Sequence, residues 1–342
     1  MVTIIGGGIA GAVLAGALGR AERPVTVYES QPTGGAGAFL VLDGRAHTAL
    51  VGLGVSADQL HAASHPVEAL RADGVSGPAR GNSTAERRLY LRAELMRVLT
   101  EFAAGSSAVL RFDTPITEVD GTAGTLGSGG RPVPADELIV AADGIDSVAR
   151  RALEPGRTAE YAGQIVIYGV TRQPVRPGTD PAVLHFDRTL GPDGRPLTTF
   201  GHLWNDTVSV WFTRLTRPPL DRQHKGAQPM DQWTDAVLAA SPAVRDVIEP
   251  LLAQTDSVHV SNARTVPLAG ARPPQLPVLL CGDADHAITP AAGVGARDAI
   301  EDAAALYEAI VSGGAPAAAM AERRRRILAE RERAAQMFRA AT

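Results

Sequence analysis

The sequence is short of several residue types, and each shortage excludes a class of protein. A single cysteine, Cys281, stands among 342 residues, so no disulfide framework can form and a reduced, cytoplasmic setting is expected. Lys225 is the only lysine and the net charge is −4, so no basic surface favours nucleic acid or an anionic membrane. The histidines are too scattered for a zinc site, and no Ser-His-Asp spacing stands out. We therefore expect no metal centre, no nucleic-acid partner and no hydrolase triad.

The sequence also lacks a hydrophobic run that we would interpret as a membrane span. Residues 1–19 carry no charge, but they have no basic start, and their six glycines follow a strand–turn–helix pattern. We interpret this stretch as a buried parallel strand followed by its crossover helix. The length of the chain suits two packed domains better than one small core.

A glycine-rich turn near the N-terminus carries the first chemical signal. Gly6, Gly8 and Gly11 follow an apolar strand and open a helix, and they have the G-x-G-x-x-G spacing that lets a backbone approach a pyrophosphate. A second strand ends at Glu29, where an acid would hold a ribose hydroxyl. This segment predicts a dinucleotide-binding protein, but many NAD and FAD enzymes share it.

Two later segments also consist of a strand that ends in an acid. The first strand ends at Asp143 and the second at Asp283, and open α/β sheets place their ligands at such carboxyl ends. The acids are followed by Gly144, Ser147 and Arg150 in the first segment, and by Gly293, Gly295 and a helix expected over 296–310 in the second.

These three motifs, in this order, resemble those of the class A flavoprotein monooxygenases, a family that includes aromatic hydroxylases and tetracycline-inactivating enzymes. The resemblance covers essentially the whole chain and extends to Arg92 in an R-x-x-L segment, to the glycine-rich residues 34–37 and to residues 300–303. It implies a Rossmann-like FAD-binding domain, NADPH or NADH as electron donor, and oxygen transfer through a flavin C4a-hydroperoxide.

The resemblance also gives each motif a place along FAD. The glycine turn and Arg92 would hold the diphosphate, Glu29 the adenosine ribose and Asp283 a ribityl hydroxyl. Asp143 and Arg150 would order the pyrophosphate region, although Asp143 could be only a helix cap. The helix after residue 295 would direct its positive end at the flavin. The expected cofactor-binding residues are Gly6, Gly8, Gly11, Glu29, Arg92, Asp143, Asp283, Gly293 and Gly295.

The middle of the chain predicts an antiparallel sheet, with strands over 161–170, 182–186 and a hairpin over 198–213. If the hairpin turn has two residues, one face is aromatic and polar and the other is largely aliphatic. The first face holds Phe200, His202, Trp204, Ser209 and Trp211, and the second holds Gly201, Leu203, Val208, Val210 and Phe212. We expect Phe200, His202, Trp211 and Pro290 to bind substrate. The alternative is a sheet with one wet face.

Several residues depart from the family pattern. Ser30 stands where arginine is common, and Thr289 replaces the first of two prolines. Arg297 replaces an asparagine beside the flavin, where it would add positive charge or turn to solvent. Asp285 replaces a small residue and is a candidate partner for Arg297. For His286 we expect a structural role rather than that of a catalytic base.

Two helical stretches complete the prediction. The first covers 233–252, with breaks at Pro242 and Pro250. The second covers 317–341 and carries the run Arg323–Arg326 interleaved with glutamates, which favours a solvated helix face over a nucleic-acid contact.

The sequence thus predicts an α/β fold with an α+β second domain: a Rossmann-like FAD-binding domain interleaved with an antiparallel-sheet substrate domain. The FAD-binding domain would comprise 1–65, 90–156 and 263–315, the substrate domain 66–89 and 157–262, and the C-terminal helix 316–342. The expected function is NAD(P)H- and oxygen-dependent hydroxylation of an aromatic or polycyclic small molecule. An FAD-dependent dehydrogenase or reductase, an FAD-retaining binding or cyclising protein, and a separate flavin reductase as partner stay open.

Overall fold

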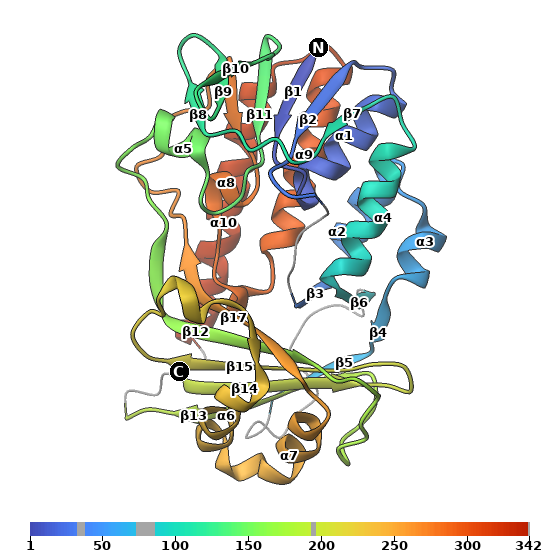
Figure 1. Cartoon of the computed structure of the whole chain (residues 1–342), viewed down its shortest axis with the longest axis vertical. Helices are drawn as coiled ribbons and strands as arrows, with labels where there is room; N and C mark the ends of the chain where they lie inside the picture. Colours follow the sequence, from blue (N-terminus) through green and yellow to red (C-terminus); the bar gives the residue numbers. More distant parts are fainter. Residues whose placement is uncertain (33–37, 73–85, 193–195, 341–342) are drawn as a thin grey trace.

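The computed structural model describes residues 1–32, 38–72, 86–192 and 196–340. Its first sheet has five parallel strands in the order β18-β11-β1-β2-β7 (Figure 1). Their bounds are Val278–Leu280, Leu138–Ala141, Val2–Ile5, Val25–Tyr28 and Val109–Arg111. In β1 all four residues are buried, as expected of a strand covered on both faces. The register places Ile5 beside both Tyr28 and Ala141, so the carboxyl ends of these strands meet at one edge.

Alternate residues of this sheet face two separate cores. Ile4, Val27 and Val140 pack against a helical layer in which α1 contacts α4 and α9, and α9 contacts α2 and α10. Ile5 and Ile139 face a second core, beneath α5 and a three-stranded sheet in the order β10-β9-β8. The helices are α1 (Ile9–Arg20), α2 (Gly44–Gly52), α3 (Ala57–Ala62), α4 (Arg92–Ala104), α5 (Val148–Leu153), α8 (Asp283–His286), α9 (Gly295–Val311) and α10 (Pro316–Ala340). The small strands are β8 (Glu118–Asp120), β9 (Thr125–Ser128) and β10 (Arg131–Val133).

A larger sheet lies across the end of this half of the molecule (Figure 1). Its seven strands have the order β16-β17-β12-β15-β14-β13-β5, and all neighbours are antiparallel except β13 and β5. In that order their bounds are Gly226–Pro229, Ser257–Thr265, Glu160–Val170, Ser209–Thr216, Pro196–Trp204, Val183–Leu190 and Ala69–Ala72. The helices α6 (Thr234–Ala240) and α7 (Arg245–Ala253) cover the face turned away from the parallel sheet. Short 3₁₀ turns cover Arg222–His224, Met230–Gln232, Pro242–Val244 and Pro290–Ala292.

A third small sheet, β3-β6-β4, stands between the two large ones. It comprises β3 (Phe39–Leu42), β6 (Arg87–Leu91) and β4 (His65–Val67). Residues of β3 and β6 pack with Leu184, Leu203 and Val210 of the seven-stranded sheet, so a hydrophobic cluster joins the two halves. The face of the seven-stranded sheet that meets this cluster is called the inner face here.

The mixed helix-and-sheet architecture confirms the predicted fold class. The domain boundaries stay a prediction, and β17 runs to Thr265, three residues beyond the expected end of the substrate segments. The predicted break at Pro250 is wrong, because this proline lies within the last turns of α7 and its missing N–H costs one hydrogen bond only. None of the described helices combines the length and apolar character that a membrane span requires.

Candidate cofactor and substrate site

The turn between β1 and α1 requires glycine at two positions. Gly6 has φ +94°, and a Cβ there would lie 2.5 Å from the carbonyl oxygen of Ala142. A Cβ on Gly11 would lie 1.9 Å from the Gly6 carbonyl oxygen. Gly8 differs, because its Cβ position is open, and it precedes a helix whose first N–H groups receive no side-chain cap. These donors are therefore free to bind an anion.

Glu29 stands beside this turn and is already held by the backbone. Its Oε2 accepts from the Gly7 N–H at 2.7 Å, and its Oε1 accepts from the Gln31 N–H at 2.8 Å and the Ser30 hydroxyl at 3.0 Å. The carboxylate, the glycine turn and Asp143 line a cavity of about 550 Å³, which we call the Glu29 cavity. A carboxylate oxygen has more than one acceptor site, so Glu29 can still accept from a ribose hydroxyl.

Asp143 also lines the Glu29 cavity, and it caps the helix α5. Its Oδ2 accepts from the N–H groups of Val148 at 2.7 Å and Ala149 at 3.3 Å, whereas Oδ1 is buried without a partner among the described residues. Burial raises the pKa of this carboxyl, and hydrogen bonds from Ser147 and the backbone oppose the rise. Arg150 is 2% exposed and donates to three carbonyl oxygens, so it fixes the loop rather than forming a surface ion pair.

Arg92 connects this region with a second cavity. Its side chain lines both cavities and forms no hydrogen bond or ion pair with any residue that the structure describes. Burial lowers the pKa of this guanidinium, and the nearby Asp283 carboxylate opposes that change. Arg92 is thus a cation that no described residue pairs with, at a place where an anionic ligand would cross from one cavity to the other.

The second cavity, of about 450 Å³, surrounds Asp283 and is called the Asp283 cavity. Asp283 is exposed to this cavity, and desolvation by the surrounding protein raises the pKa of its carboxyl. Gly293, Gly295 and Pro290 line the same cavity. A Cβ on Gly293 would meet nothing within 4 Å, and α9 begins at Gly295 without a side-chain cap. A flat group can therefore approach this backbone closely, facing the N-terminus of α9.

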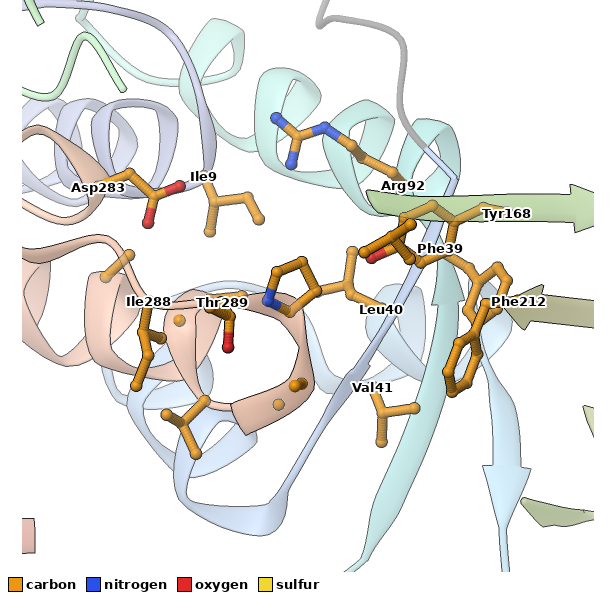
Figure 2. A pocket seen from close by; sticks show the side chains of 18 of the residues that line it. Ile9, Phe39, Leu40, Val41, Arg92, Tyr168, Phe212, Asp283, Ile288 and Thr289 are labelled. Carbon is orange, nitrogen blue, oxygen red and sulfur yellow. The ribbon is translucent and has the colours of Figure 1, made fainter. Parts of the chain in front are cut away.

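The opposite wall of the Asp283 cavity is aromatic. Tyr168 and Phe212 come from adjacent strands of the inner face, and Phe39 of β3 meets Tyr168 edge to face at 5.5 Å between ring centroids. Figure 2 shows this group facing Asp283 across the cavity, with Arg92 above it. Burial raises the pKa of Tyr168 to about 12, so its hydroxyl stays protonated and can donate a hydrogen bond.

This wall is not the hairpin face that we expected. The alternation was right, because His202 pairs with Trp211 and Phe200 with Thr213. The turn has four residues, 205–208, not two. Phe200 and Trp211 point away from the Asp283 cavity into the core beneath α6 and α7, and the Trp211 indole N–H donates to the Thr255 hydroxyl at 3.0 Å. The aromatic residues of this face are buried because the helices α6 and α7 cover it.

His202 lies on the same face of the seven-stranded sheet as Phe200 and Trp211, opposite the inner face. Its ring stacks on His185 at 4.9 Å between centroids, and burial lowers its pKa to about 3. Sequence reasoning missed Tyr168, Phe39 and Arg214 as lining residues. One signal was present: Gly201 lies opposite Phe212, which leaves room for a ring on the face that looked aliphatic.

The residues present fit FAD. The two cavities share Gly8, Arg92, Ala142 and Gly144, so they form one elongated site. The site contains, in this order, a hydroxyl acceptor (Glu29), the uncapped N–H groups of α1, a guanidinium that no described residue pairs with (Arg92), a second acceptor (Asp283) and an open glycine backbone. This order matches the ribose, diphosphate, ribityl chain and flat ring of that cofactor. Residues 34–37, which also belong to the resemblance, lie outside the described part of the chain.

Comparison with known proteins decides the family. The FAD-binding-domain family matches residues 1–322. The chain belongs to it. Kynurenine 3-monooxygenase of Salinispora arenicola is 27% identical, over 94% of this chain and 74% of that protein. The 3-amino-4-hydroxybenzoate 2-monooxygenase PtnB3 of Streptomyces platensis is 28% identical, over 90% and 78%. The structure of CtdE with FAD and substrate 4 superposes with a TM-score of 0.77 at 20% identity, over 99% of this chain and 88% of that one. The protein is a class A FAD-dependent monooxygenase.

In this monooxygenase the loop after β18 is fixed by buried charges. Asp285 is fully buried and does not pair with Arg297, contrary to our expectation. It accepts instead from Arg157 at 2.9 Å and from two nitrogens of Arg324 at 2.6 and 2.7 Å. Arg157 also pairs with Glu154. The solvated face predicted for α10 is confirmed for Arg325 and Arg326, which are exposed and pair with Glu322. It is wrong for the buried Arg324, whose partner Asp285 lies 39 positions away in the sequence.

A second buried cluster holds the start of the same loop. The imidazole Nε2 of His286 lies 2.6 Å from Asp302 Oδ2, and Asp302 also accepts from the Gly282 N–H at 3.0 Å and from Arg323 at 2.9 Å. Burial alone would lower the pKa of His286, but the Asp302 carboxylate raises it overall. His286 is 2% exposed and does not line the Asp283 cavity, so the structure places it among packing and loop contacts.

Arg297 neither faces the Asp283 cavity nor extends freely into solvent. Its guanidinium lies between Asp43 at 3.3 Å, Asp298 at 3.0 Å and Glu330 at 3.0 Å. The replacement of asparagine therefore changes how α9 is joined to α2 and α10, and it adds no side chain to the cavity.

Proposed function

We propose that this monooxygenase uses NAD(P)H and O₂ to hydroxylate an aromatic or polycyclic small molecule. The observation that carries the proposal is the Asp283 cavity, in which the residues suited to the flavin face an aromatic wall. A relative named for 3-amino-4-hydroxybenzoate, a benzoic acid, agrees with such a substrate. We place the reaction in the cytoplasm, where the buried Cys281 stays reduced.

The residues of the chain supply binding, orientation and exclusion of water. When bound, FAD supplies the redox chemistry and the activation of oxygen. Glu29, the glycine turn and Arg92 would hold its adenosine and diphosphate, and Asp283 a ribityl hydroxyl. The N-terminus of α9 favours negative charge at the flat ring. Phe39, Tyr168 and Phe212 close the other side, so the reacting atoms are shielded from bulk water.

The decisive experiment measures oxygen uptake by the FAD-loaded enzyme with NADPH and a panel of phenols and aromatic acids. Under ¹⁸O₂ the product should gain one labelled oxygen atom, which mass spectrometry detects. A dehydrogenase would oxidise substrate without label, and a binding or cyclising protein would show no substrate-stimulated uptake. If NADPH and NADH both fail but chemically reduced flavin supports labelling, a separate reductase supplies the electrons.

A further inference from the structure

Two aromatic side chains follow each other on β15, and each leans over a glycine of a neighbouring strand. Trp211 pairs with Gly169 of β12, and Phe212 pairs with Gly201 of β14. A Cβ on Gly169 would lie 2.2 Å from Cε2 of Trp211, and a Cβ on Gly201 would lie 2.3 Å from Cε1 of Phe212. Each ring therefore occupies the space in which the side chain of its cross-strand neighbour would stand.

The two glycine–aromatic pairs lie on opposite faces of the sheet and have different surroundings. Trp211 is fully buried in the core beneath α6 and α7. Phe212 is half-buried, because part of its ring lines the Asp283 cavity (Figure 2). The Gly169–Trp211 pair thus contributes to core packing, whereas the Gly201–Phe212 pair borders the space in which we expect the substrate.

The ring of Phe212 is held among other side chains of the cavity wall. Its centroid lies 6.0 to 6.4 Å from those of three other lining rings, Phe186, Tyr168 and Phe39. The guanidinium carbon of Arg214 lies 5.4 Å from the same centroid, which is a cation–π contact. A side chain at position 201 would push the tip of the Phe212 ring out of its place, and the open space beside the ring is the Asp283 cavity. The residue at position 201 thus determines how far this ring extends into the cavity.

The aromatic wall is longer than a single substrate ring. Phe186, Phe212 and Tyr168 come from β13, β15 and β12, and Gly201 of β14 lies between the first two in the register. Four adjacent strands span about 14 Å, whereas the centroids of two interacting rings lie about 4.5–7 Å apart. Because position 201 carries no side chain, a flat ligand can contact this wall with more than one of its rings. Aliphatic side chains continue the lining: Leu40, Val41, Leu184 and Ile288.

We propose that Gly201 and Phe212 together set the size limit for the substrate, so that this enzyme binds fused aromatic molecules of two or more rings more tightly than single-ring phenols. The inference rests on the proposed function and adds the residues that determine its specificity. Neither residue transfers a proton or an electron. The pair acts through the space that Gly201 leaves and through the ring surface that Phe212 offers. A methyl group at position 201 should therefore leave room for a single ring only.

The test measures binding, not turnover. The FAD-loaded enzyme is titrated with two matched pairs, phenol with 2-naphthol and catechol with naphthalene-2,3-diol, and the flavin absorbance change gives each Kd. In at least one pair we expect the two-ring member to bind at least about 10-fold more tightly, because its second ring also contacts the apolar wall. Gly201→Ala should reduce this ratio to below about threefold, and it should change the Kd of the single-ring member by less than about threefold, because the displaced Phe212 ring takes only the space of the second ring.

Gly169→Ala is the matched control, because it adds the same methyl group against the ring of Trp211 on the opposite face of the sheet. It should lower the melting temperature and leave the ratio within about twofold of the parent value. The double variant Gly201→Ala/Phe212→Leu gives the space back, so its ratio should return toward that of the parent. Phe212→Trp fills the same space without a change on β14 and should also lower the ratio, so it carries the test if Gly201→Ala does not fold.

Equal binding of both members in both pairs, no binding of either two-ring compound, or an unchanged ratio in Gly201→Ala or Phe212→Trp would overturn the assignment. The same holds if Gly169→Ala lowers the ratio as much as Gly201→Ala does, or if the double variant stays at the low ratio, because the methyl group would then act through the backbone and not through Phe212. These results differ from failure of the proposed function, which would appear as a protein that takes up no FAD or that produces no labelled product from any phenol.

Discussion

Replacement of Asp285 by asparagine probes the buried charges that hold the loop after β18. The Asp285 carboxylate is fully buried, and both of its oxygens accept hydrogen bonds from arginines, at 2.6 to 2.9 Å. Asparagine preserves the size of the side chain, but it removes the charge and turns one acceptor into a donor that faces guanidinium groups.

The expected loss follows from what the two arginines keep. Arg157 still pairs with Glu154, whereas Arg324 has no other acidic partner among the described residues and keeps only the carbonyl oxygen of Arg272. Removal of one member of a buried ion pair costs about 3–5 kcal/mol. We therefore expect Asp285→Asn to lower the free energy of unfolding by about 4 kcal/mol, out of a typical total of about 5–15 kcal/mol.

The assay is urea unfolding of the apoprotein, followed by far-ultraviolet circular dichroism. Tryptophan fluorescence is unsuitable alone, because all three tryptophans, Trp204, Trp211 and Trp233, belong to the seven-stranded sheet and its covering helix layer. Glu322→Gln is the control, since among the described residues Glu322 pairs only with the exposed Arg325 and Arg326 of α10. If Asp285→Asn unfolds at the same urea concentration as this control, the buried cluster does not stabilise the fold as argued.

Four further changes test other parts of the site. Asp283→Ala should weaken FAD binding by about 1–3 kcal/mol, because polar groups of the cofactor lose their acceptor; unchanged affinity in a flavin titration would contradict the assignment. Gly11→Ala should abolish most FAD uptake, because the new Cβ would lie 1.9 Å from a backbone oxygen of the glycine turn; full flavin content in the purified variant would show that the turn can move aside. Trp211→Ala should destabilise the protein by about 3–5 kcal/mol without changing the Kd of a bound aromatic acid. A changed Kd at constant stability would show that Trp211 belongs to the substrate site. His286→Gln should destabilise the protein most at low pH. Asp302 raises the pKa of folded His286 above 6.5, so the stabilisation by protonated His286 is present below the unfolded pKa and is lost as the pH rises through the folded pKa. If the urea midpoints of the variant and the parent differ by the same amount from pH 5.5 to 9, this linkage is excluded.

The cofactor end of the site could be predicted because its signals are local. Glycine at positions 6 and 11 is required by contacts within the same turn or with the neighbouring strand. Asp143 and Asp283 each follow a strand within three residues, and parallel strands bring their carboxyl ends to one edge. The sequence pattern therefore predicts this half of the site residue by residue.

The substrate end could not be predicted in the same way, because it depends on what covers each face of a sheet. Alternation along the hairpin correctly groups Phe200 with Trp211, but it does not say which face two later helices will cover. Arg323 and Arg324 likewise look like a solvated run until Asp302 and Asp285, distant in the sequence, are placed beside them.

Helix α10 reaches back to the residues beside Asp283 through the side chains of Arg323 and Arg324. During synthesis the glycine turn, Glu29 and Arg92 emerge early, yet Asp285 and Asp302 receive these arginine partners only after α10 has been made. Until then Asp285 has only Arg157, and Asp302 only His286, as a charged or titratable partner among the described residues. Removal of α10 should therefore loosen the loop that carries Asp283 and weaken FAD binding, although no described residue of α10 lines the Asp283 cavity.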